Sequence, residues 1–202
     1  LAAAQSIHAV LLGGGSAFGL DAAGGVMQFL EEKGIGFDVG VTKVPLVCQS
    51  DIFDLTVADA HVRPDKEMGY EACKGAYADN YQDGNFGVGT GATVGKFRGM
   101  DYCMKSGIGS YAVQIGELKV GAIVAVNALG DIYDHHSDRI VAGMLNEERS
   151  AFADTAKLLY SSYEVHDNKF VGNTTIGAII TNARFDKSQL SKIAGMAHNG
   201  YA

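Results

Sequence analysis

The sequence predicts an α/β fold in which layers of sheet are covered by helices on the outside. Residues 8–34 follow the order strand, sharp turn and helix, and residues 175–201 repeat that order. A glycine-rich, strand-rich middle separates them. The chain has 202 residues, of which 47% are hydrophobic, and this suits one substantial domain with a real core. We therefore expect residues 1–202 to form a single domain.

The first half is predicted from apolar spacing and turn residues. Residues 8–12 read as a short buried strand, and the turn at 13–16 leads into a helix over 18–33 that ends before Gly34, a typical C′ glycine. The apolar side chains of this helix recur at helical spacing. They are Ala22, Val26, Phe29 and Leu30.

Three further pieces complete the first half. Residues 44–47 and 52–55 read as short extended segments around Pro45. Residues 67–78 have a second helical pattern. Its apolar residues on one side are Met68, Ala72 and Ala76.

The second half begins with a hairpin and ends with a helix. Residues 110–116 and 120–128 read as two strands joined by a tight turn near Glu117, after a glycine-rich stretch at 84–95. Residues 131–133 read as a third strand. Residues 134–170 are polar and charged, with helical spacing near 152–159, and we expect them to be an excursion or linker outside the core.

The final strand is predicted at 175–182 and the final helix at 187–201. Asp186 and Gln189 have the spacing of a capping box at the start of this helix. Its apolar side chains should form a buried face. They are Leu190, Ile193, Ala194 and Ala197.

Composition excludes several classes of function. The net charge is −7 and the 16 Lys and Arg residues are scattered, so no basic stripe indicates nucleic-acid binding. No apolar run reaches about 18 residues, so we expect no membrane span. Cys48, Cys73 and Cys103 are widely spaced without a C-x-x-C pair, which favours neither a zinc knuckle nor a disulfide framework. A reduced, cytoplasmic setting fits best.

The two ends of the sequence look cut. Residue 1 is Leu, and the first segment has no basic region of the kind that begins a secretory signal. The last residues lie inside a helical pattern without a cap. We therefore expect a truncated or partly ordered version of a longer gene product.

The segment Gly172-Asn173-Thr174-Thr175 places a hydroxyl at the start of a predicted buried strand, after two residues that suit a tight turn. A self-cleaving precursor needs this arrangement. Once the bond before Thr174 breaks, the new α-amine, with a pKa of about 7.7–8.0, can serve as the base for its hydroxyl. The alternative is an ordinary turn leading into a strand. Asn173-Thr174-Thr175 also matches the glycosylation pattern, which has little weight without a secretory signal.

Two other polar residues are candidates for the same site. Asn127 ends an apolar strand, where its amide N–H groups suit an oxyanion, although a turn Asn before Gly130 is as good an interpretation. Lys96 is a lone cation beside glycines that allow close approach, whereas most lysines are solvated. Because Phe97 follows it, the segment is not a Walker loop.

Other motifs fail specific tests. Phe18 stands where both a dinucleotide loop starting at Gly13 and a hydrolase elbow around Ser16 need glycine, so residues 13–19 predict a turn whose N–H groups face a pocket, or simply a strand–helix turn. His135 and His136 are adjacent and would point to opposite faces of a strand. We therefore expect no metal site and no cofactor.

Taken together in order, these segments resemble the L-aminopeptidase/D-esterase family of self-processing hydrolases, which includes the β-peptidyl aminopeptidases and the nylon-oligomer hydrolases. The likeness runs from about residue 8 to the end. The ordered set is specific, although each motif alone is weak. The segments are LGGGSAFGLDAAGGVM at 12–27, GIGF at 34–37, VP at 44–45, IFD at 52–54, GTGATVGK at 89–96, VAVNALGD at 124–131 and GNTTIG at 172–177.

The resemblance implies self-cleavage between Asn173 and Thr174, giving an α part (1–173) and the start of a β part (174–202), with Thr174 as the N-terminal nucleophile. By the same match, Asn127 is the oxyanion-stabilising Asn and Lys96 a catalytic-site Lys of the nylon-oligomer branch. The implied fold is a four-layer α/β/β/α sandwich similar to that of the ornithine acetyltransferases. The implied assembly is a homotetramer or larger homo-oligomer.

The sequence departs from the family in three ways. Phe53 replaces a Tyr that hydrogen-bonds in the site of several relatives, which bears on substrate choice. The acidic Asp-Gly-Asp-type segment that orients the nucleophile in relatives does not occur before Ala202, and the family's N-terminal strands are not evident.

The resulting hypothesis is an aminopeptidase or amidase that releases N-terminal residues from small peptides, amides or esters through an acyl-enzyme on Thr174, with Phe53 and Ser16 in the substrate pocket. Two alternatives stay open. One is acyl transfer of the ornithine acetyltransferase type, and the other is a catalytically degenerate relative that only binds ligands or assembles.

Overall fold

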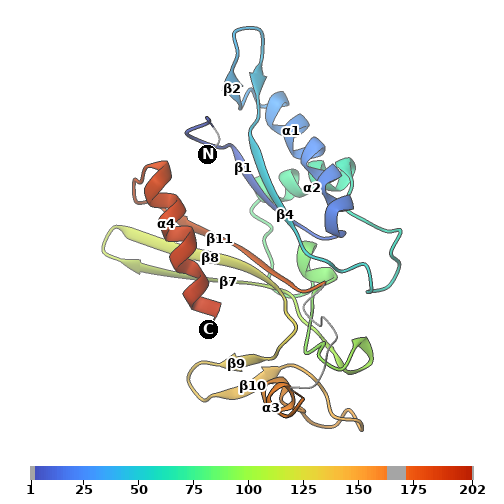
Figure 1. Cartoon of the computed structure of the whole chain (residues 1–202). Coiled ribbons are helices and arrows are strands. Elements are labelled where there is room, and N and C mark those ends of the chain that lie inside the picture. Colours follow the sequence, from blue (N-terminus) through green and yellow to red (C-terminus); the bar gives the residue numbers. More distant parts are fainter. Residues whose placement is uncertain (1–2, 163–171, 202) are drawn as a thin grey trace.

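The computed structural model of the chain describes residues 3–162 and 172–201, and these form a mixed α/β structure with several small sheets (Figure 1). The helices are α1 (Ala22–Glu32), α2 (Lys66–Tyr77), α3 (Thr155–Ser161) and α4 (Lys187–Ala197). The strands are β1 (Ala9–Gly13), β2 (Phe37–Asp38), β3 (Lys43–Val44), β4 (Val47–Asp51), β5 (Thr93–Val94), β6 (Met104–Lys105), β7 (Ile108–Ile115), β8 (Leu118–Asn127), β9 (Ile132–Asp134), β10 (Arg139–Ala142) and β11 (Thr174–Thr181). The α/β prediction is confirmed at this level.

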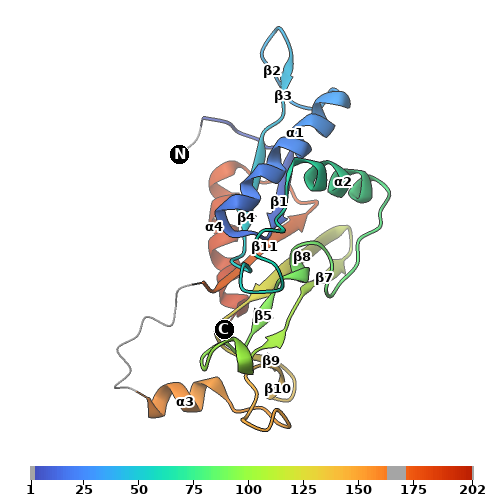
Figure 2. The same cartoon turned by 90° about the vertical axis from the view of Figure 1, so that its right-hand side faces the viewer.

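In the first half, β1 and β4 form a parallel pair, and α1 lies beside it with α2 (Figures 1 and 2). The face predicted for α1 is confirmed, because Ala22, Val26, Phe29 and Leu30 are all buried. Gly34 ends the helix with a φ of +66°, a conformation that glycine adopts without strain.

The contact between α1 and α2 depends on glycine. A Cβ on Gly69 would lie 2.0 Å from the carbonyl oxygen of Ala22, so the two backbones meet directly at this point. The apolar side that the sequence gives to α2 faces solvent instead, and Met68 is 49% exposed. The side of α2 that meets α1 also carries Tyr70 and Tyr77, whose rings lie edge-on to Phe29 with centroids 5.5 and 5.2 Å away.

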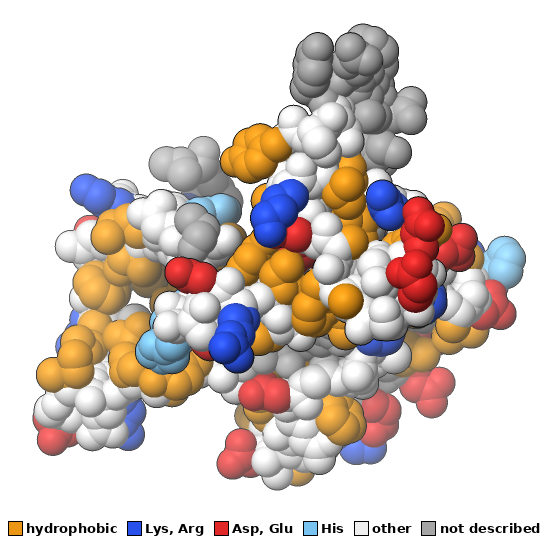
Figure 3. Space-filling view, turned by 90° about the horizontal axis from the view of Figure 1, so that it is seen from below, with side chains coloured by type: hydrophobic (Ala, Val, Ile, Leu, Met, Phe, Trp, Pro, Cys, Tyr) orange, Lys and Arg blue, Asp and Glu red, His pale blue; other side chains and the backbone are white. Residues whose placement is uncertain are grey.

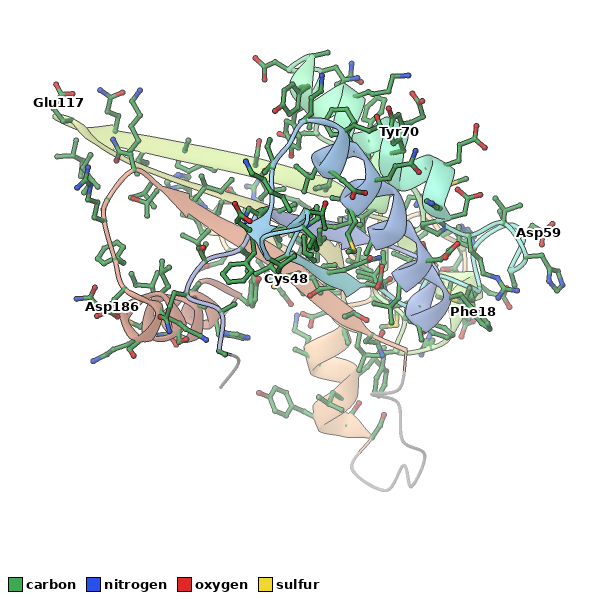
Figure 4. The ribbon with its side chains drawn as sticks, turned by 90° about the horizontal axis from the view of Figure 1, so that it is seen from above. Phe18, Cys48, Asp59, Tyr70, Glu117 and Asp186 are labelled. Carbon is green, nitrogen blue, oxygen red and sulfur yellow. The ribbon has the colours of Figure 1, made fainter. Side chains whose placement is uncertain are left out.

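The second half is built on an antiparallel sheet in the order β11-β8-β7. The predicted hairpin of β7 and β8 is confirmed, and Glu117 lies at its tip (Figure 4). Ile52, immediately after β4, packs in one buried cluster with Val88, Ala92 and Ala125, the last from β8. This core joins the end of the parallel pair to the antiparallel sheet. It lies near the end of the sheet where β8 finishes at Asn127 and β11 begins at Thr174.

Helix α4 has the predicted start but not the predicted buried face. The capping box of Asp186 and Gln189 is present, and Asp186 marks the start of the helix in Figure 4. The predicted buried face is wrong, because no residue of α4 is buried and Leu190 is 48% exposed. An apolar stripe shows which side of a helix avoids water, but within the described residues no layer covers this side. Figure 3 shows other hydrophobic side chains at the surface seen from below.

The stretch at 134–170 holds β10 and α3, which lie with β9 at the lower end of the molecule in Figure 1. Asp131 ties this part together, because its carboxylate accepts hydrogen bonds from the backbone N–H of Met144 (2.8 Å) and of Thr155 (2.6 Å). Residues 163–171 lie outside the described part of the chain. Among helices of the described ranges, none has the length and apolar character needed to cross a membrane.

Candidate functional site

The register of β11 against β8 brings Thr174 and Asn127 together. Thr174 begins β11, Asn127 ends β8, and the two residues are direct cross-strand partners. Side chains of such partners lie on the same face of a sheet with their Cβ atoms about 5 Å apart. The predicted hydroxyl and the predicted carboxamide are therefore neighbours.

The backbone of Phe53 connects the two residues. Its N–H donates to Thr174 Oγ1 at 3.4 Å, and its carbonyl oxygen accepts a hydrogen bond from Asn127 Nδ2 at 2.7 Å. Phe53 enters this position because it follows Ile52, which is fully buried in the core between the two sheets. Phe53 was predicted as a pocket residue, and it lies beside Thr174, with its backbone making the hydrogen bonds.

Asn127 is fully buried, and every polar atom of its side chain has a hydrogen-bond partner. Oδ1 accepts from the backbone N–H of Thr93 at 3.2 Å, from Thr93 Oγ1 at 3.3 Å and from Lys96 Nζ at 2.8 Å. These contacts fix the orientation of the amide, since a nitrogen in that place would face the Thr93 N–H and the Lys96 ammonium, which can only donate. Nδ2 therefore points toward Phe53 and the Thr174 side of the site.

Lys96 contributes a positive charge directly to Asn127. Its Nζ donates to the side-chain oxygen at 2.8 Å and to the backbone oxygen at 3.1 Å. The backbone N–H of Lys96 also donates to the carbonyl of Leu129 at 2.8 Å, which holds the glycine-rich segment against the end of β8. Burial disfavours the charged ammonium and lowers the pKa of Lys96 to about 8, while the nearby Cys103 acts in the opposite sense.

The turn before Thr174 has the expected geometry. Gly172 has a φ of +83°, in the left-handed region, and a Cβ placed there would lie 3.1 Å from the ring of Phe53. The ring of Phe53 therefore lies beside Gly172, one residue before Asn173 and the Asn173–Thr174 bond. A larger residue at position 172 would be strained and would press on Phe53.

Ser16 is held next to Ile52, the residue before Phe53. Its backbone N–H donates to the carbonyl of Ile52 at 3.0 Å, so the loop that carries it is fastened beside Phe53. The glycines of this loop make room for a carboxylate, because Asp54 Oδ1 accepts from the N–H of Gly15 at 2.7 Å and a Cβ on Gly14 would lie 2.4 Å from Asp54 Oδ2. A loop that receives the protein's own carboxylate agrees with the exclusion of a phosphate loop.

Sequence reasoning missed Thr93 and Lys105. Thr93 is buried and orients Asn127, and its position between Gly91 and Gly95 was the available sign that its side chain faces a crowded backbone. Lys105 Nζ donates to the carbonyls of Thr90 (2.5 Å) and Ala92 (2.9 Å), so it holds the same glycine-rich segment. Burial is the main cause that lowers the pKa of Lys105. This role could not be predicted from sequence, because lysines usually face solvent.

Across residues 3–162 and 172–201, no group of three or more His, Cys, Asp or Glu residues is arranged to hold a metal ion. The rings of His135 and His136 lie next to each other in the turn between β9 and β10, with centroids 3.8 Å apart and planes tilted by 38°.

The chain is similar to several known proteins over nearly all of its length. A protein of Mycobacterium leprae named as an uncharacterized aminopeptidase is 37% identical over 200 residues, which cover 97% of this chain and 54% of that protein. A Mycobacterium tuberculosis protein with the same description is 37% identical over 206 residues, covering 97% and 56%. A 6-aminohexanoate-oligomer endohydrolase of Agromyces is 29% identical over 203 residues, covering 95% and 54%. The chain thus spans about half the length of these relatives.

The sequence pattern of peptidase family S58 matches residues 2–202, nearly the whole chain. This match agrees with the names of the relatives and with the order of the motifs along the sequence. The resemblance is confirmed, and the chain belongs to peptidase family S58.

Proposed function

We propose that this protein is a self-cleaving aminopeptidase or amidase that acts on small peptides, amides or esters through an acyl-enzyme on Thr174. The observation that carries the proposal is the pairing of Thr174 with Asn127, with the backbone of Phe53 hydrogen-bonded to both side chains. The names of the relatives, aminopeptidase and oligomer endohydrolase, support hydrolysis of amide bonds.

In the self-cleavage step, Thr174 Oγ attacks the carbonyl carbon of Asn173. The C–N bond breaks as the C–O bond forms, the hydroxyl proton passes to the departing nitrogen, and an ester joins the two parts. Water then hydrolyses the ester, which leaves a carboxylate on Asn173 and a free α-amine on Thr174. The tight turn at Gly172 favours this step by presenting the peptide bond at the start of β11.

In turnover, the α-amine of Thr174 takes the proton from its own Oγ, and Oγ attacks the carbonyl carbon of the substrate. A side-chain N–H of Asn127 stabilises the negative oxygen, and the Lys96 ammonium strengthens this by withdrawing electron density through Oδ1. The leaving amine takes the proton from the ammonium, and water hydrolyses the acyl-enzyme. Lys96 acts through Asn127 and is a positioning residue.

A parallel assay distinguishes hydrolysis from its alternatives. The purified protein is given an alanyl anilide in one reaction and acetyl-ornithine with glutamate in another. The proposal expects release of the aniline and no acetylglutamate. Acetyl transfer without anilide hydrolysis would identify an acyltransferase, and the absence of both cleavage and turnover would identify a protein that only binds or assembles.

We expect the rate of self-cleavage to fall as pH rises through about 8, because Lys96 loses the charge that polarises Asn127. Before cleavage Thr174 has no α-amine, so a change of rate near pH 8 cannot come from that amine, and we assign it to Lys96. Burial raises the pKa of the Cys103 thiol, so its ionisation shifts to higher pH. The rate is measured from pH 6 to 9 on protein made by cell-free translation, by separating the fragments.

The matched variant for this measurement is Lys96→Arg, whose guanidinium stays charged throughout the pH range. Its rate should be lower but should lack the fall above pH 8. A rate that instead rises through pH 8, with the rise absent in the variant, would mean that neutral Lys96 is the base for the hydroxyl.

Thr93→Val removes one donor to Asn127 Oδ1 and keeps the shape of the side chain. We expect turnover to fall about tenfold, since a neutral hydrogen bond contributes about 1 kcal/mol and the amide of Asn127 loses part of its orientation. Thr90→Val is the control, because Thr90 Oγ1 bonds the carbonyl of Asn85 away from Asn127. Equal losses in the two variants would contradict the role given to Thr93.

The finer architecture is part of the same proposal. The β1–β4 pair beside α1 and α2, joined through the core to the β11-β8-β7 sheet beside α4, supports a four-layer α/β/β/α sandwich similar to the ornithine acetyltransferase fold (Figure 2). We propose one domain, cut into residues 1–173 and 174–202, with 134–170 as an excursion.

Exposed apolar residues such as Leu190 and Tyr111 support assembly into a homotetramer or larger homo-oligomer. We also propose a cytoplasmic location.

A further inference from the structure

An open cavity of about 540 Å³ adjoins the candidate site on the Thr93 side. Thr93 is shared by both, because it lines the cavity while its N–H and Oγ1 donate to Asn127. A ligand in this cavity therefore lies one residue away from the carboxamide that faces Thr174. Nothing in the proposed mechanism uses this space.

The walls of the cavity combine apolar side chains with positive charge. Met100, Met104 and Leu145 supply flexible apolar surface. Lys105 and Arg149 supply two cations, and none of the described residues that line the cavity is Asp or Glu. In a chain with a net charge of −7, a cavity of this sign is a local reversal that disfavours ammonium groups and favours carboxylates.

The two cations differ in their hydrogen bonds. The ammonium of Lys105 donates to carbonyls of the glycine-rich segment. Arg149 is exposed, and one Nη donates to the carbonyl of Asp101. Because a guanidinium has five N–H donors in a planar fork, Arg149 keeps donors for a carboxylate at the cavity mouth.

We propose that this cavity binds the part of the substrate that ends in a free carboxylate, with an aliphatic segment along the methionine wall and the carboxylate on Arg149. That the bound molecule is a substrate rests on the proposed function, whereas the binding of an aliphatic carboxylate is inferred from the residues that line the cavity and is testable without turnover. If both hold, the substrates are amides whose far end is an aliphatic carboxylate.

The first experiment compares alanyl-leucine with alanyl-leucinamide, which differ only in the charge at the far end. We expect kcat/KM to be about tenfold higher for the carboxylate, and this ratio to fall toward one in Arg149→Gln and to persist in Arg149→Lys. Arg98→Gln is the matched control, because Arg98 pairs with Glu147 at 3.8 Å and does not line the cavity. Normal turnover of both substrates with a ratio of one in the wild type would overturn the subsite and leave the hydrolase proposal intact.

The second experiment needs no catalysis. Hexanoate and hexylamine are titrated against the purified protein and followed by NMR. Hexanoate should bind at least about tenfold more tightly than hexylamine, with the preference lost in Arg149→Gln and reduced at high salt. Equal or tighter binding of hexylamine would overturn the proposal. If hexanoate binds as expected and neither dipeptide is cleaved, the proposed function fails while the carboxylate site stands.

Discussion

Replacing Thr174 with alanine should leave the chain uncut after Asn173 and reduce amide turnover by at least about 10³-fold. Both steps use the same oxygen, which first attacks the Asn173 carbonyl and later the carbonyl of the substrate. Alanine has no atom that replaces Oγ, whereas the strand pairing of residue 174 with Asn127 depends on the backbone alone. The fold should therefore persist while the chemistry is lost. Intact mass and anilide hydrolysis are the two measurements.

Two variants make this result specific. Thr174→Ser keeps an attacking oxygen and should be cut and active. Thr175→Ala removes the next hydroxyl, which pairs with Val126 and points to the opposite face of the sheet, so cleavage and turnover should stay near those of the wild type. An uncut Thr174→Ala protein that still hydrolyses the anilide would remove Thr174 from the mechanism.

The second large effect concerns stability. Gly95→Ala should lower the free energy of unfolding by at least about 3 kcal/mol, because two penalties act together. Gly95 has a φ of +70°, which strains any residue with a Cβ, and that Cβ would lie 2.0 Å from the backbone nitrogen of Met144. Backbone atoms cannot rotate away as a side chain would. The displacement would also break the 2.8 Å hydrogen bond from Gly95 N–H to the Gly130 carbonyl, which helps to place Lys96.

Gly34→Ala separates the two penalties. Gly34 has a similar φ of +66°, but no atom lies within 4 Å of its added Cβ. Only the conformational cost of about 1–2 kcal/mol applies there. Urea unfolding of both variants measures the difference between them. Equal losses would show that the contact with Met144 has no influence on stability.

Local patterns predicted the elements of the fold well where a side-chain pattern exists. The hairpin around Glu117, the buried face of α1 and the capping box of α4 all follow from spacing over a few residues. Two helix faces were predicted wrongly. On α2, the side that meets α1 is the one with Gly69, Tyr70 and Tyr77, where the two tyrosine rings pack against Phe29. On α4, the predicted apolar side exists but is not covered by another element in the described part of the chain.

The candidate site shows the same division. Thr174, Asn127 and Lys96 were each recognisable as polar residues at the end of a strand or beside glycines. The meeting of Thr174 with Asn127 depends on the register between β8 and β11, and Lys96 joins them through the backbone hydrogen bond from its N–H to Leu129. Both contacts link segments far apart in the sequence. Thr93 was marked in the sequence only by its place between Gly91 and Gly95, and Lys105 had no such mark, because their roles come from hydrogen bonds to Asn127 and to backbone carbonyls.

The most direct test of the central claim is to determine the N-termini of the purified protein by chemical labelling of α-amines followed by mass spectrometry. Self-cleavage predicts a second N-terminus that reads Thr-Thr-Ile-Gly-Ala, starting at Thr174, in equal amount to the first. A protein that hydrolyses amides while every recovered peptide across this position still joins Asn173 to Thr174 would contradict the account.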